Sequence, residues 1–264
     1  MKSLIVKICL LLSIILFSRC SSDGLTRVVI VTDYGNIELQ LYEKTPEHAA
    51  NFVKLAKEGF YDGLLFHRVI KDYLIQGGDP DSKNAAPGAL LGRGGPAYTV
   101  AAEINPEYIH KRGALAAYRM EGQSDPTKAS SGSQFYIVHG RKYSDYELNQ
   151  IEMQIAEGNA VDMYYQYVRE AEAANRSAGV TASIDTVVLR ERASAWLLDN
   201  PYKMRAEDRE IYKTLGGFPH YDGEYTVFGE VIKGIEVIDK IVELETDDAD
   251  RPKTDVRIKK VRVK

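Results

Sequence analysis

Short alternations of apolar and polar residues, the period of a β-strand, recur along most of the chain. Residues 36–42 show the pattern most clearly, because three aliphatic side chains share one face while Glu38 and Gln40 share the other. Similar runs predict further strands at 27–32, 64–70, 73–76, 98–101, 114–118, 134–138, 226–232 and 255–263. Many short strands separated by glycine-rich or polar turns indicate a β-sandwich or a closed barrel.

Two short helices accompany these strands. Thr45 is expected to cap the first helix, since Pro46 and Glu47 then occupy its first turn and apolar residues at helical spacing continue it to residue 57. The second helix is predicted at 235–242, where apolar residues dominate.

Residues 141–215 follow a different pattern, because only two of the 21 glycines lie there. Ser144 and Glu147 have the spacing of a capping box, and apolar residues at helical spacing follow them. We predict four helices in this stretch. The predicted domains are a β-rich domain of residues 25–139 and 216–264 and a helical insertion of residues 140–215.

The first 24 residues have the pattern of an export signal. Lys2 precedes an apolar run over residues 4–17, which is shorter than the roughly 20 residues of a membrane-spanning helix. Cys20 and a small polar tether over 20–24 follow, which resembles the lipobox of bacterial lipoproteins, although Arg19 replaces the usual small residue. The resemblance implies a signal peptide over 1–19, lipidation of Cys20 and an anchor in the bacterial cell envelope, at the outer membrane with a periplasmic or surface face. The alternative is an ordinary export signal in which Cys20 is incidental.

Composition excludes several classes of function. The chain has two cysteines, Cys9 and Cys20, so the body beyond the leader contains no disulfide, thiol nucleophile or cysteine metal site. The net charge of −4, from 34 basic and 38 acidic residues, provides no basic field for nucleic acid. The five histidines show no metal-ligand spacing, so we expect neither a metal nor a cofactor.

The richest candidate chemistry lies in residues 66–80. Strand alternation directs Arg68 and His67 to opposite faces, and an arginine on a half-apolar face needs partners or a ligand. Glutamine and aromatic residues follow in two further strands, at 133–137 and 225–229.

These segments together resemble the cyclophilin-type peptidyl-prolyl isomerases. The matching motifs occur in family order and are FHRVI (66–70), YLIQGGDP (73–80), GALAAYR (113–119), GSQFYI (132–137) and DGEYTVFGEVIKG (222–234). The resemblance covers most of 25–139 and 216–264. It implies a mainly β fold, a closed eight-stranded antiparallel barrel capped by two helices, at 45–57 and 234–242.

The resemblance also implies an active groove on the outside of the barrel. Arg68 matches the catalytic arginine and Gln76 the groove glutamine, and both are assigned to catalysis. Substrate contacts are assigned to Tyr73, Leu74, Tyr118, Gln134, Phe135, Tyr136, His220 and Tyr225. Among these, Tyr73, Leu74 and Tyr136 match the apolar floor that accepts a proline ring.

The predicted function is cis–trans isomerisation of Xaa-Pro bonds in exported polypeptides, without a cofactor. The alternative is a non-catalytic proline-binding or chaperone module that uses the same groove. Because the insertion returns just before His220, we expect it beside one end of the groove, where it contacts clients or a partner. The expected partners are proline-containing segments of exported chains and, through the lipid, a membrane. Nothing in the sequence demands more than a monomer.

Overall fold

A computed structural model describes residues 25–120 and 126–264. The predicted signal peptide, Cys20 and the tether all fall within residues 1–24 and so lie outside the described residues. Eight antiparallel strands form one sheet in the order β10-β1-β2-β9-β6-β8-β4-β3. The strands are β1 (Arg27–Thr32), β2 (Asn36–Leu41), β3 (Phe66–Ile70), β4 (Leu74–Gly77), β6 (Ala114–Ala117), β8 (Phe135–Val138), β9 (Val227–Lys233) and β10 (Ile258–Val263). Two short strands, β5 (Thr99–Val100) and β7 (Ser130–Ser131), pair separately.

The sheet is curled into a half-barrel, and the expected closed barrel is wrong in this respect. Its edge strands β3 and β10 are joined by one isolated bridge, Leu65 to Arg257, rather than by a regular ladder. Only scattered backbone hydrogen bonds continue the contact, such as Phe66 N to Val256 O at 2.9 Å. The segment opposite β3 contains Pro252, which has no N–H, and Asp250 at a φ of 60°. A strand cannot continue through such a segment.

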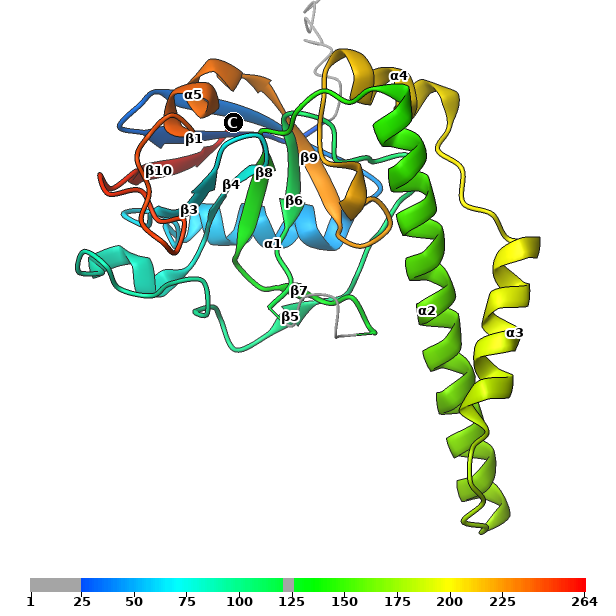
Figure 1. Cartoon of the computed structure of the whole chain (residues 1–264). Coiled ribbons are helices and arrows are strands. Elements are labelled where there is room, and N and C mark those ends of the chain that lie inside the picture. The colour runs from blue at the N-terminus through cyan, green and yellow to red at the C-terminus, as the bar shows by residue number, and fades with distance from the viewer. Residues whose placement is uncertain (1–24, 121–125) are drawn as a thin grey trace, which may run out of the picture.

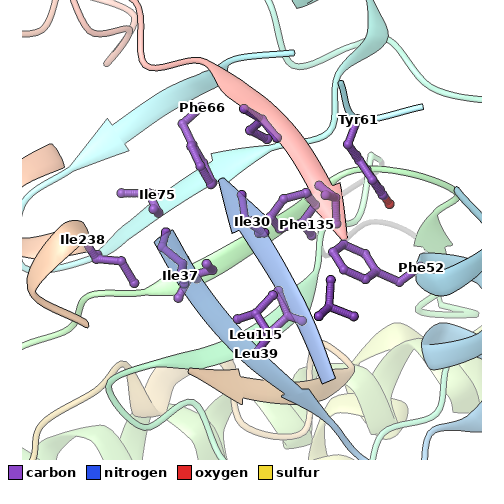
Figure 2. Packing of buried hydrophobic residues seen from close by; sticks show 14 of the residues in the cluster. Ile30, Ile37, Leu39, Phe52, Tyr61, Phe66, Ile75, Leu115, Phe135 and Ile238 are labelled. Atoms are coloured by element: carbon purple, nitrogen blue, oxygen red, sulfur yellow. The ribbon is translucent and has the colours of Figure 1, made fainter. Parts of the chain in front are cut away.

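The core fills the inside of the curl. The alternation predicted for β2 is confirmed, since Ile37 and Leu39 are fully buried there. Figure 2 shows them packed near Phe135 of β8 and Phe52 of the first helix, whose rings lie 5.3 Å apart. Burial of each such side chain stabilises the fold by about 1.5–3 kcal/mol.

Two helices close the ends of the curl, α1 (Pro46–Lys57) and α5 (Ile235–Ile241), close to the predicted bounds (Figure 1). Thr45 stands at the N-cap of α1, but its side chain makes no capping bond, contrary to the expectation. Instead, the carboxylate of Glu103 accepts from Glu47 N at 3.0 Å and His48 N at 2.9 Å. A full negative charge at the helix N-terminus replaces the weaker hydroxyl acceptor.

The insertion contains three helices, α2 (Asp145–Ala178), α3 (Thr186–Asp199) and α4 (Ala206–Thr214), rather than four. The first two expected helices are one, because α2 runs straight through Gly158, which costs about 1 kcal/mol relative to alanine. The capping box of Ser144 and Glu147 is confirmed. Figure 1 shows α2 and α3 as a hairpin that projects away from the sheet.

The base of the insertion is attached firmly to the β-domain. Arg141 and Gly217 exchange two backbone hydrogen bonds, of 3.2 and 3.0 Å. A Cβ on Gly140 would lie 2.5 Å from the Cα of Gly217, so this junction requires glycine. A separate apolar cluster includes Ile109 of the β-domain and Tyr212 of α4. Helix α4 is therefore packed as part of the domain.

Candidate active site

A cleft of about 490 Å³ opens on the outer face of the sheet, over β3 and β4. Four of the predicted site residues line it, namely Arg68, Gln76, Tyr118 and Tyr225. The remaining wall comes from the loop of residues 89–93, from Arg119 and Met120, from Tyr221, and from Ala249 and Arg251. The sheet thus brings side chains that are distant in sequence to one hollow.

A chain of side-chain hydrogen bonds holds Arg68 in this cleft. Arg68 and Gln76 are directly paired residues of β3 and β4, so their side chains share a face. The Nη1 of Arg68 donates to Oε1 of Gln76 at 3.5 Å, and the Nε2 of Gln76 donates to Oε1 of Gln134 at 2.9 Å. Gln134 in turn donates to the carbonyl of Gly94 at 2.7 Å. Both glutamines are almost completely buried, so the arginine is the exposed end of a fixed chain.

The Nε of Arg68 also donates to Asp250 at 3.4 Å, and its Cζ lies 5.6 Å from the ring centre of Tyr73. The ion pair is partly exposed, with 34% and 44% of the two side chains accessible, so it contributes little to stability. A purely structural ion pair does not account for the buried glutamine chain behind Arg68. The arrangement instead orients a guanidinium toward the cleft.

An aromatic cluster lies beside this chain. Tyr136 and Leu74, both predicted for the floor, are 1% and 2% exposed and do not line the cleft. The hydroxyl of Tyr136 is hydrogen-bonded to His110 Nε2 at 3.0 Å, and its ring centre lies 6.0 Å from that of Tyr225. Tyr73 is half-buried and packs on Phe218 with ring centres 4.4 Å apart. The predicted floor residues therefore cluster together, with Leu74 and Tyr136 beneath the surface and Tyr73 partly exposed.

Two predicted contact residues do not fit a direct role in substrate binding. Phe135 packs into the core with Phe52 and Phe66, because alternation along β8 directs it opposite to Tyr136. His220 packs on Phe218 outside the lining of the cleft, since the 3₁₀ turn Pro219–Tyr221 presents Tyr221 there instead. Gln134 does not line the cleft either, and it contacts Gln76 by accepting the hydrogen bond from Nε2 of that residue.

Sequence reasoning missed Tyr221 and Arg119. Arg119 is 1% exposed, donates to the carbonyl of Glu224 at 2.8 Å and lies 5.2 Å from the ring centre of Tyr225. It therefore fixes the position of Tyr225 against the cleft. Tyr221 lies next to the position assigned to His220, and the strand period cannot predict which residue a 3₁₀ turn presents.

Burial governs the ionisation of the nearby groups. It lowers the pKa of His67, which lines the cleft, to about 4, and raises the pKa of Tyr221 and Tyr225 well above its ordinary value. The imidazole is therefore neutral and both phenols keep their protons at neutral pH. The charged side chains that line the cleft are those of Arg68, Arg93, Arg119 and Arg251.

A second constellation has the order of a hydrolytic triad but lies outside the cleft. His48 bridges Ser130 Oγ at 2.9 Å and Glu103 Oε2 at 2.6 Å. Ser130 is completely buried, and Glu103 already caps α1, so the three residues connect a helix to a strand. Within residues 25–120 and 126–264, no cluster of three His, Cys, Asp or Glu side chains is arranged to hold a metal. In the same ranges, no helix is long and apolar enough to cross a bilayer.

Comparison with known proteins identifies the family of this chain. The sequence model of the family "Cyclophilin type peptidyl-prolyl cis-trans isomerase/CLD" matches residues 27–161 and 205–263. The chain belongs to this family, which confirms the predicted enzyme class. The unmatched stretch between the two matched segments, residues 162–204, includes the distal part of the α2–α3 hairpin.

Individual relatives show how far the similarity extends. Peptidyl-prolyl cis-trans isomerase B of Bacillus subtilis is 44% identical over 117 residues, which are 43% of this chain and 71% of the relative. A Streptococcus pyogenes protein named "Putative bifunctional phosphatase/peptidyl-prolyl cis-trans isomerase" is 29% identical over 90% of this chain, which spans only 38% of that protein. A crystal structure of a cyclophilin-type isomerase from Cryptosporidium parvum, 21% identical, gives a TM-score of 0.54 over 91% of this chain and 98% of its own. It supports the fold.

Proposed function

We propose that this chain accelerates cis–trans isomerisation of Xaa-Pro bonds in exported polypeptides, with Arg68 as the catalytic residue. The observation that carries the proposal is the placement of Arg68, at the end of a buried glutamine chain and on the wall of a cleft. Membership of the isomerase family supports the reaction.

Prolyl isomerisation needs a hydrogen-bond donor that stabilises the twisted transition state, and it needs no general acid or base. Rotation about the peptide bond breaks its resonance and has a barrier of about 18–20 kcal/mol. In the twisted state the prolyl nitrogen regains a lone pair, which accepts a hydrogen bond that the planar amide does not offer. A guanidinium donor therefore stabilises the transition state more than the ground state. A rate gain of about 10⁵ requires only about 7 kcal/mol.

Each neighbour of Arg68 then has a specific task. Gln76 directs Oε1 at Arg68 and Nε2 at Gln134, so it is a positioning residue rather than a group that holds the substrate carbonyl. Tyr118 and Tyr225 form walls for the peptide on the cleft side. Arginine suits the central position because it stays charged and donates in a fixed fork.

Exported clients and a lipid anchor belong to the proposal because of the pattern in residues 1–24. The test of this part is the distribution of the full chain between membrane and soluble fractions of a bacterial host. With Cys20→Ser, the membrane fraction is expected to lose the protein, while the isomerase activity per molecule stays unchanged. Equal membrane association of both chains would contradict lipidation at Cys20.

The test on polypeptide substrates is refolding of an unfolded protein whose slow phase is limited by prolyl isomerisation, which takes roughly tens to hundreds of seconds uncatalysed. Residues 25–264 are expected to accelerate this phase at catalytic concentration, and Arg68→Ala to abolish the acceleration. Binding of the unfolded polypeptide by wild-type protein without acceleration of the slow phase would favour the non-catalytic proline-binding module.

A further inference from the structure

The floor expected to receive a proline ring is covered in this structure. Tyr136, Leu74 and Tyr73 are all absent from the lining of the cleft, whereas Tyr221 lines it. Tyr136 is only 1% exposed, and the ring centre of Tyr221 lies 6.1 Å from that of Tyr136. Tyr225 also lines the cleft, with its ring centre 6.0 Å from that of Tyr136, so Tyr221 and Tyr225 are the cleft-lining rings next to the buried part of the expected floor.

Several contacts hold Tyr221 in this position. Its ring centre lies 4.3 Å from Tyr225 and 4.8 Å from Phe218. Its hydroxyl is hydrogen-bonded to the hydroxyl of Tyr73, whose ring also packs on Phe218. Burial raises the pKa of both tyrosines, so a proton is available for this bond at neutral pH.

We propose that Tyr221 is an aromatic lid on the proline pocket, held shut by its bond to Tyr73, and that its ring must turn away before a prolyl ring contacts Tyr136. This inference rests on the proposed function, since it assigns the covered floor to the proline of the substrate. Turning the ring needs no backbone unfolding, because Tyr221 is only half-buried and already faces the cleft.

A closed lid weakens binding in a predictable way. When only a fraction of the molecules has an open pocket, the apparent dissociation constant rises by the inverse of that fraction. A net hydrogen bond between neutral groups is worth about 0.5–1.5 kcal/mol, so loss of the Tyr73–Tyr221 bond shifts the lid population by about two- to tenfold. Removing either hydroxyl should therefore tighten binding.

The experiment measures the dissociation constant of an Ala-Pro tetrapeptide by NMR titration of residues 25–264. Tyr221→Phe and Tyr73→Phe are each expected to tighten binding about two- to tenfold, and the double variant to tighten it no further, because both remove the same bond. The matched control is Tyr146→Phe, whose side chain is exposed on α2, and its affinity should equal that of wild type. Unchanged or weaker binding by Tyr221→Phe overturns the lid.

A second measurement does not depend on any substrate. Fluorotyrosine labelling and a soluble paramagnetic agent report the exposure of Tyr136, whose signal is assigned by its loss in Tyr136→Phe. Tyr136 should be shielded in wild type and exposed in Tyr221→Leu, and continued shielding overturns the lid. If Tyr136 becomes exposed but no variant accelerates prolyl exchange, the proposed function fails while the covering role of Tyr221 stands.

Discussion

The side chain of Arg68 is held in one orientation by its buried neighbours. Its guanidinium is partly exposed, yet the two glutamines that orient it are almost completely buried. Buried amides with satisfied partners keep one geometry, because any other arrangement leaves polar groups unpaired. The guanidinium of Arg68 is therefore preorganised in the cleft, and the side chain loses little conformational freedom when a substrate binds.

His67, which precedes Arg68 on β3, makes stability depend on pH. Strand alternation predicts opposite faces for the two residues, but the register of β3 shifts between Phe66 and Arg68, and both residues line the cleft. Its folded pKa of about 4 lies below its ordinary value of 6.5, because burial disfavours the charged imidazole. Between these two values the unfolded chain binds a proton that the folded chain does not. The free energy of unfolding should therefore fall as pH decreases from 6.5 to 4, by about 3 kcal/mol in total from this residue.

Urea denaturation at pH 7, 6 and 5 measures this dependence. Replacement His67→Gln removes the titrating group, so the variant should lose less stability over this range than wild type does, whatever its stability at pH 7. Parallel pH profiles for the two proteins would show that His67 does not carry the effect. Burial also lowers the pKa of His48, which adds to the slope in both proteins.

At the residue scale, the sequence could predict the arginine and its glutamine but not the covered floor. The motifs and strand alternation identify Arg68 and Gln76 as neighbours on one face. The same alternation excludes Phe135 from the groove once Tyr136 is placed in it. No local pattern predicts that Tyr221 covers Tyr136, because that contact joins a 3₁₀ turn to a strand 85 residues earlier in the chain.

At the scale of elements, helix α4 is coupled to the groove. The hydroxyl of Tyr212 donates to Asp222 Oδ2 at 2.5 Å, and Asp222 Oδ1 accepts from the backbone N–H of His110 at 2.8 Å. The ring of His110 is hydrogen-bonded to Asp222 and, at 3.0 Å, to Tyr136. A continuous chain of buried polar groups therefore runs from the insertion to the groove floor. No residue of 140–215 lines the cleft itself, and the place of the insertion beside the groove stays a prediction.

Loss of the first bond in this chain should be costly. Tyr212→Phe is expected to lower the free energy of unfolding by about 1–3 kcal/mol, because Asp222 loses a buried donor. Tyr146→Phe, in the same insertion but exposed, should change it by less than about 0.5 kcal/mol. Chemical denaturation of both variants checks this, and equal stabilities would show that the buried chain is not a structural tie.

The α2–α3 hairpin has a different role from α4. It projects from the domain (Figure 1) and exposes large apolar side chains, among them Tyr165, Val187 and Leu198. Replacing residues 157–200 with a four-residue glycine-serine linker keeps the bonds of Glu152 to Lys203 and Met204 at the base of the insertion. Comparison of this shortened protein with wild type therefore distinguishes the contribution of the hairpin to activity from that of the groove.

We expect this shortened protein to catalyse exchange in a tetrapeptide as wild type does, within about twofold, and to accelerate refolding of a long unfolded chain several-fold less well. The first result follows because the cleft is untouched, and the second is what client binding by the hairpin predicts. Refolding activity equal to that of wild type would contradict a role of the hairpin in client binding.

For the molecule as a whole, the sequence predicts the family, the strand order along the chain and a helical stretch within residues 141–215. It does not predict how the sheet closes, because the irregular contact beside β3 and β10 depends on residues 181 or more positions apart, such as Val69 and Asp250. It also predicts two helices where α2 is one, because local spacing does not show that packing of α2 on α3 keeps the helix continuous. Tertiary contacts decide both cases.

The central claim is that Arg68 in this cleft turns over prolyl peptide bonds, and NMR exchange spectroscopy on an Ala-Pro tetrapeptide tests it most directly. Wild-type residues 25–264 should accelerate cis–trans exchange, Arg68→Ala should abolish the acceleration, and Arg68→Lys should retain little of it because a point charge lacks the fixed fork. Acceleration that survives in Arg68→Ala, or peptide line shifts without acceleration in wild type, would contradict the claim.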